Sequence, residues 1–106
     1  MTTFDKREEG FEKRFALDEE TRFKALARRN KKLGLWAAQK LGLFGEAAEA
    51  YAKEVVIADL EEAGDEDVFR KLRTDFDAKG VAVSDHQIRR SMDEFLAAAA
   101  AEMKAG

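Results

Sequence analysis

At 106 residues the chain is long enough for one domain and a short additional segment, but not for two separate hydrophobic cores. It has no proline and no cysteine, 39% of its residues are charged, and its formal net charge is −3. The missing cysteines exclude disulfides, thiolate metal sites and thiol catalysis. Because no long apolar run or signal-peptide core is present, we expect a cytoplasmic protein that does not insert into a membrane.

The first stretch, residues 1–19, combines a narrow row of phenylalanines with charges of both signs. On a helix, Phe4, Phe11 and Phe15 would fall within about 40° of one another. Gly10 costs such a helix about 1 kcal/mol relative to alanine, so we expect the isolated segment to be only partly helical. Two interpretations are open: an ordinary first helix that packs on its own domain, or an arm that folds when it docks on a partner.

A block of cations follows this arm, and no acidic residue interrupts it between Glu20 and its end at Lys32. Its members are Arg22, Lys24, Arg28, Arg29, Lys31 and Lys32. Such a block can bind phosphates or an acidic protein surface, although a solvated helix face is the more ordinary interpretation. The alternative function for the chain is therefore binding of nucleic acid, with Trp36 as a stacking partner, or of an adenine nucleotide, which no sequence motif supports. The candidate residues of this patch are Arg22, Arg28, Arg29 and Lys32.

Two helices are predicted in the first half of the domain. The first covers residues 19–41, and Trp36 points away from its apolar side, toward either a second neighbour or an exposed groove. That apolar side consists of Phe23, Leu26, Ala27, Leu33, Ala37 and Leu41. The second helix covers residues 45–62. It has so little polar surface that we expect it to lie at the centre of the domain. Its apolar residues are Ala47, Ala48, Tyr51, Ala52, Val55, Val56, Ala58 and Leu60.

Two further helices are predicted in the second half. The third covers about residues 65–79 and buries Val68, Phe69, Leu72 and Phe76. Its initial acids, Asp65, Glu66 and Asp67, lack the spacing of a calcium loop and are better explained as helix caps. The last helix begins after a Ser84–Gln87 capping box, with Val83 packing on Ile88, and its buried face consists of Ile88, Met92, Phe95, Leu96, Ala99 and Met103.

These elements predict an all-α protein, a small antiparallel four-helix bundle over residues 20–106, preceded by a helical or partly disordered arm over residues 1–19. Catalysis is not expected, because the sequence shows no pair of titratable residues whose different surroundings would give one a high and the other a low pKa, as an acid–base pair requires. The single histidine, His86, has no second ligand or neighbouring nucleophile, so we predict neither a metal site nor a catalytic dyad.

Four blocks of sequence, in this order, resemble the ζ subunit of α-proteobacterial F-type ATP synthases. They are MTTFDKRE at residues 1–8, with Phe11 and Phe15 following, FKALARRN at 23–30, LGLWAA at 33–38, and GDEDVFRKL at 64–72. The resemblance extends from residue 1 to about residue 76, and beyond Lys79 it is one of helical character more than of motif.

The resemblance implies a regulatory inhibitor without a cofactor, located at the inner membrane only through the ATP synthase. Its partners would be the catalytic subunits of the soluble head and the central rotor. By position, residues 1–19 would be the segment that enters a catalytic subunit interface and blocks ATP hydrolysis. Aromatic rings would fill apolar slots there, and cations would pair with acids, which gives the candidate residues Phe4, Lys6, Arg7, Phe11, Lys13, Arg14 and Phe15.

Overall fold

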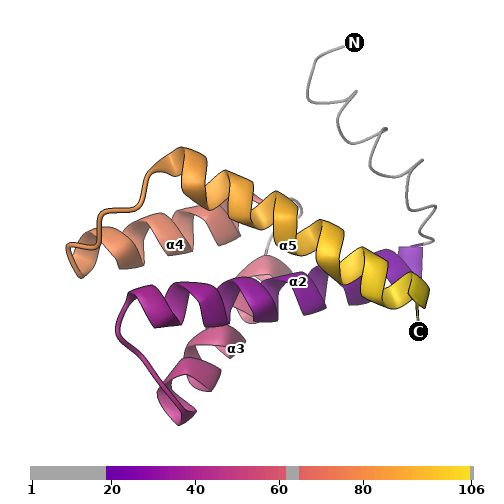
Figure 1. Cartoon of the computed structure of the whole chain (residues 1–106), viewed down its shortest axis with the longest axis horizontal. Coiled ribbons are helices and arrows are strands. Elements are labelled where there is room, and N and C mark those ends of the chain that lie inside the picture. Colours follow the sequence, from indigo (N-terminus) through magenta and orange to yellow (C-terminus); the bar gives the residue numbers. More distant parts are fainter. Residues whose placement is uncertain (1–18, 62–64, 106) are drawn as a thin grey trace.

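The computed structural model describes residues 19–61 and 65–105 of the chain. They form four α-helices, α2 (Glu19–Lys40), α3 (Glu46–Glu61), α4 (Glu66–Ala78) and α5 (Asp85–Ala105), shown in Figure 1. The predicted all-α class and the four helices are confirmed, each boundary to within one or two residues. The division between arm and domain at residue 19 lies at the edge of the described residues and stays a prediction.

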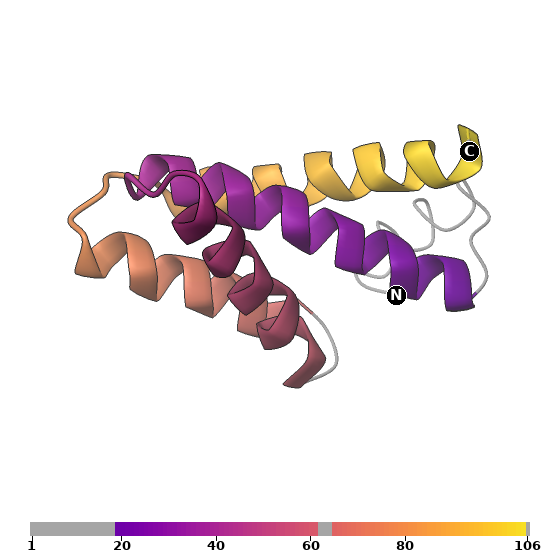
Figure 2. The same cartoon turned by 90° about the horizontal axis from the view of Figure 1, so that it is seen from below.

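The long helix α2 makes the two most extensive helix–helix contacts of the described residues, one with α3 and one with α5. It runs beside α5 in the opposite direction, and α4 packs against both α3 and α5 (Figures 1 and 2). The expectation that residues 45–62 lie centrally is therefore wrong. Helix α3 has a solvent-facing side on which Ile57 and Leu60 are 56% and 62% exposed.

The core is formed where the four helices meet, and its members include Leu33, Val55, Leu72 and Ile88. The Trp36 ring packs edge-on against Phe76 of α4, with ring centroids 5.9 Å apart, and lies 6.4 Å from the ring of Phe95 in α5. The prediction that Trp36 covers a second neighbour is confirmed. This indole connects α2 to the two helices of the second half.

Helices α2 and α3 approach most closely at Gly34. A Cβ atom at this position would lie 2.6 Å from the Cα atom of Ala52, which is closer than real carbon atoms pack. Only glycine therefore permits this backbone separation. Gly42, with φ of +81°, then forms the turn that returns the chain toward α3.

The two predicted capping motifs have different outcomes. At the start of α5, the backbone N–H of Gln87 donates to Ser84 Oγ over 3.1 Å. The backbone N–H of Ser84 donates to Gln87 Oε1 over 3.0 Å, which confirms the capping box. At the start of α4, Asp65 makes no capping hydrogen bond with its side chain. Asp65 occupies the N-cap position as predicted, with Glu66 and Asp67 in the first turn, but its carboxylate binds Arg29 instead of a helix amide.

One residue of the predicted apolar side of α2 is not buried. The ring of Phe23 is 59% exposed, although its spacing from Leu33 and Ala37 placed it among the core residues. Figure 2 shows the cause among the described helices, since the beginning of α2 extends beyond α3 and α4 and lies beside the end of α5. Ala25, two positions later, is fully buried, so at this end of α2 one side of the helix is covered and the Phe23 side is not.

Candidate functional site

The first half of α2 is the part of the described chain that joins the predicted arm. The candidate arm residues Phe4, Lys6, Arg7, Phe11, Lys13, Arg14 and Phe15 lie outside the described residues. The four residues of the basic patch are described, so their surroundings can be compared with the prediction.

Arg28 and Lys32 share one carboxylate, Glu102, from the last turns of α5. Arg28 Nη1 lies 3.3 Å from Glu102 Oε1, and Lys32 Nζ lies 2.7 Å from Glu102 Oε2. The hydrogen bond from Lys32, reinforced by the charges of both cations, lowers the pKa of the Glu102 carboxyl below its usual value. These two cations therefore tie the end of α5 to α2 and are only in part available to an anion.

Arg29 does not belong to a surface patch, which corrects the prediction for this residue. Its side chain is 1% exposed and is held by groups from three helices or their ends. Its Nε donates to Asn30 Oδ1 over 2.6 Å, and its Nη2 donates to Asp65 Oδ1 over 2.8 Å and lies 4.0 Å from Asp59 Oδ1. Such partners offset the cost of removing a guanidinium from water.

Asp59, near the end of α3, completes this polar cluster. Burial raises the pKa of the Asp59 carboxyl, although a hydrogen bond from Asn30 and the charge of Arg29 act in the opposite direction. A sequence signal for the cluster exists, because Arg29 lies four residues after Ala25 and four before Leu33, and both of these are fully buried. That spacing places Arg29 on the inner face of α2, so the cluster joins α2 to the ends of α3 and α4.

The remaining cations of the block lie on the outside of α2. Lys24 Nζ is 3.2 Å from Glu20 Oε1 in an exposed pair one turn apart. Arg22 and Lys31 are also exposed. The predicted block is thus divided into an outer face with several cations, a pair of cations shared with α5, and one buried cation.

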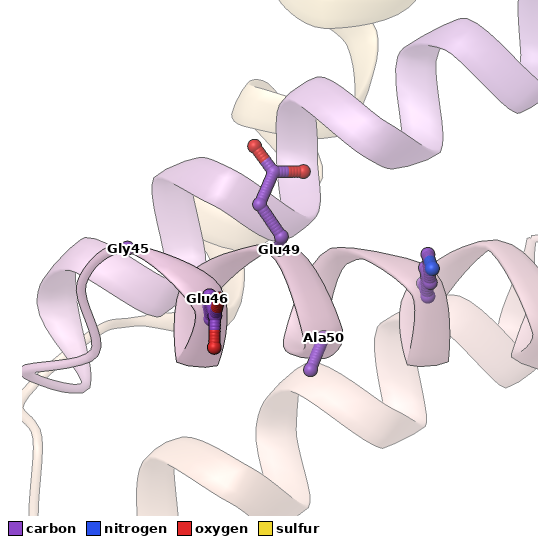
Figure 3. A pocket seen from close by; sticks show the side chains of 5 residues that line it. Gly45, Glu46, Glu49 and Ala50 are labelled. Carbon is purple, nitrogen blue, oxygen red and sulfur yellow. The ribbon is translucent and has the colours of Figure 1, made fainter.

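Hollows elsewhere on the described surface are open and shallow in character. The one in Figure 3 lies along the first turns of α3 and is lined by Gly45, Glu46, Glu49, Ala50 and Lys53, all of them exposed. Figure 3 shows that its two carboxylates point in different directions, so they do not converge on a ligand. A ligand there would stay largely in contact with water.

A second hollow separates α3 from α4, and its charges are already paired within the chain. Lys71 Nζ donates to Glu54 Oε1 over 2.9 Å and to Asp75 Oδ2 over 3.1 Å, and the Tyr51 hydroxyl donates to Asp75 Oδ2 over 2.7 Å. Burial, followed by this hydrogen bond and the negative charge of Asp75, raises the pKa of Tyr51. The network stabilises the contact between α3 and α4.

Two kinds of site can be assessed over the part of the chain that the structure describes. Within residues 19–61 and 65–105, histidines and carboxylates do not gather in groups of three or more that could hold a metal ion. Over the same residues, no helix combines the length and the apolar character needed to cross a membrane.

Comparison with known proteins identifies the family of the chain. None of the curated proteins compared with the chain matches it. A protein whose structure was solved by solution NMR is 48% identical, superposes with a TM-score of 0.69, and aligns over 78% of this chain and 94% of its own. The family model of ATPase inhibitor subunit zeta matches residues 1–102, the arm included. The chain therefore belongs to the ATPase inhibitor subunit zeta family.

Proposed function

We propose that this protein inhibits the F-type ATP synthase by inserting residues 1–19 into a catalytic subunit interface of the soluble head. The single observation that carries the proposal is the family match, which begins at residue 1 and so includes the arm as well as the domain. The inserted arm approaches the central rotor and blocks rotation in the direction of ATP hydrolysis. The protein lies at the inner membrane only through its contact with the synthase.

The packing of the described domain supports this division of roles. The described core draws its buried apolar residues from α2, α3, α4 and α5 and the turns between them. No buried side-chain nitrogen or oxygen in the described residues lacks a hydrogen-bond partner. The described helices therefore satisfy the buried polar side chains of the domain among themselves.

In this proposal Phe4, Phe11 and Phe15 supply the binding energy of the arm. Burial of one such ring contributes roughly 1.5–3 kcal/mol, and the cost of ordering the segment is subtracted from the sum. Binding then depends on a state of the head in which the interface is open. The cations Lys6, Arg7, Lys13 and Arg14 pair with acids that line the interface.

Removal of the arm tests the proposal. A chain that begins at residue 20 should keep the helical circular dichroism and melting temperature of the intact protein but should no longer inhibit ATP hydrolysis by the cognate synthase. If the shortened and the intact proteins inhibit at the same concentration, the arm is not the inhibitory segment.

The alternative function, binding of a nucleotide or nucleic acid by the basic block, is not favoured by a specific observation. Arg29 is buried, and Arg28 and Lys32 share Glu102. Because Trp36 follows Lys32 by about one turn of α2, titration with ATP followed by Trp36 fluorescence tests nucleotide binding. A saturable change in emission would favour a nucleotide site, and retention on DNA that salt abolishes would favour nucleic acid.

A further inference from the structure

The most exposed aromatic ring on α2 belongs to Phe23, which makes no ring contact with another described residue. The α2–α3 crossing at Gly34 is eleven residues further along, or about 16 Å at 1.5 Å per residue. No described helix other than α5 lies beside this end of α2 in Figure 2. The ring therefore has no place in the domain's own core, and the folded state gains little from its apolar surface.

Phe23 belongs to a face of α2 that is both apolar and basic. At 100° per residue, Phe23, Lys24, Ala27 and Lys31 fall within about 100° of one another. Lys24 and Lys31 are exposed, and Lys31 makes no ion pair with another described residue. A surface with one large ring between lysines fits a partner that offers an apolar slot with acidic edges.

The position of this face indicates which partner would cover it. Phe23 follows the last residue of the predicted arm by four positions, about one helical turn. A protein that holds residues 1–19 is therefore brought next to Phe23 without any change in the domain. Glu20 also falls on this face and pairs with Lys24, so the positive charge of Lys31 is the one that favours an acidic surface of that protein.

We propose that a second part of this chain, besides the arm, contacts the ATP synthase head. The face of α2 made by Phe23, Lys24, Ala27 and Lys31 docks on a surface of the head that lies beside the binding site of the arm and combines an apolar pocket with acidic residues. This inference rests on the proposed function for its partner. The ring of Phe23 anchors the contact, and the two lysines set its orientation. The contact holds the domain next to the head and limits the directions in which the arm can leave.

A pair of phenylalanine variants of the full chain tests the anchor. Phe23→Ala should raise the concentration for half-maximal inhibition of ATP hydrolysis by about tenfold, the effect of losing one buried ring. Phe44→Ala is the matched control, because Phe44 is 72% exposed and lies in the turn at the other end of α2. It should leave inhibition unchanged, and both variants should melt at the temperature of the unsubstituted chain.

A pair of lysine variants tests the charge. Lys31→Glu should weaken inhibition severalfold at low salt, with the difference disappearing at high salt. Lys53→Glu on α3 is the control, since Lys53 is also exposed and also makes no ion pair with a described residue. Equal inhibition by the Phe23→Ala and Phe44→Ala variants, or by the two lysine variants, would overturn the inference.

The same assay separates this inference from the proposed function. If alanine at Phe4, Phe11 and Phe15 abolishes inhibition while Phe23→Ala has no effect, the arm is inhibitory and the further contact does not exist. If Phe23→Ala weakens inhibition while the triple variant inhibits normally, the contact on α2 stands and the arm is not the inhibitory segment.

Discussion

The guanidinium of Arg29 in α2 lies 2.8 Å from the carboxylate of Asp65 at the start of α4, 36 positions later in the chain. This bond and the nearby carboxylate of Asp59 connect three helices through one buried cation. It explains why Asp65, at the N-cap position of α4, makes no capping hydrogen bond with its side chain.

Removal of this cation should destabilise the domain. We expect Arg29→Ala to lower the free energy of unfolding by about 3 kcal/mol, because hydrogen bonds to charged groups contribute about 1.5–3 kcal/mol and Asp59 would lose its positive neighbour. Lys31→Ala, two positions later but exposed, should change it by less than about 0.5 kcal/mol. Urea unfolding followed by circular dichroism measures both, and equal stabilities would show that the buried cluster contributes nothing.

Asp59 should give the domain an unusual dependence on pH. Its folded-state pKa is raised by burial, so between the unfolded and the folded pKa the folded protein binds more protons than the unfolded chain. The contribution of this group is therefore complete at pH values below its unfolded pKa, and it is lost as the pH rises through the raised folded pKa. Other carboxylates also titrate in acid, so the effect has to be read as a difference from a variant.

Asp59→Asn isolates this contribution, since asparagine keeps an oxygen that accepts the hydrogen bond from Asn30. Measured against the unsubstituted chain in unfolding experiments at a series of pH values, the variant should gain relative stability as the pH rises from the unfolded pKa of Asp59 through its raised folded pKa. A difference that is constant over this range would contradict the raised pKa of Asp59.

The close approach of α2 and α3 predicts the sign of the stability change caused by a substitution at Gly34. Gly34→Ala should lower the free energy of unfolding by about 1–3 kcal/mol, because the new methyl group would overlap the backbone of Ala52. Helix propensity alone predicts the opposite, a gain of about 1 kcal/mol. Ala50→Gly, at an exposed position of α3, measures that propensity term directly. A stabilised Gly34→Ala variant would show that the helices can separate without loss.

Local signals explain why the helices could be predicted from the sequence. The turn between α2 and α3 begins at Gly42, where a positive φ favours glycine, and α5 begins at a reciprocal pair of hydrogen bonds between Ser84 and Gln87. Both features depend on residues a few positions apart. They fix where helices end, but they do not determine which helix faces which neighbour.

Phe23 and Arg29 show what depended on distant residues. Periodicity placed Phe23 in the core, but whether that turn of α2 is covered depends on where α3 crosses it, at Gly34 and Ala52. Arg29 was predicted at the surface because a charged residue is rarely buried, and the carboxylates that permit its burial lie 30 and 36 positions away. The arm residues were predicted from their pattern and from the family resemblance, and they remain a prediction.

The measurement that tests the central claim most directly uses the full chain with alanine at Phe4, Phe11 and Phe15. Inhibition of ATP hydrolysis by the cognate ATP synthase is compared for this variant, the unsubstituted chain and the Phe44→Ala control. We predict that the triple variant keeps its helical content but needs at least about a hundredfold higher concentration to inhibit, because three ring burials are lost. Inhibition by the triple variant at the concentration of the unsubstituted chain would contradict the inhibitory role of the arm.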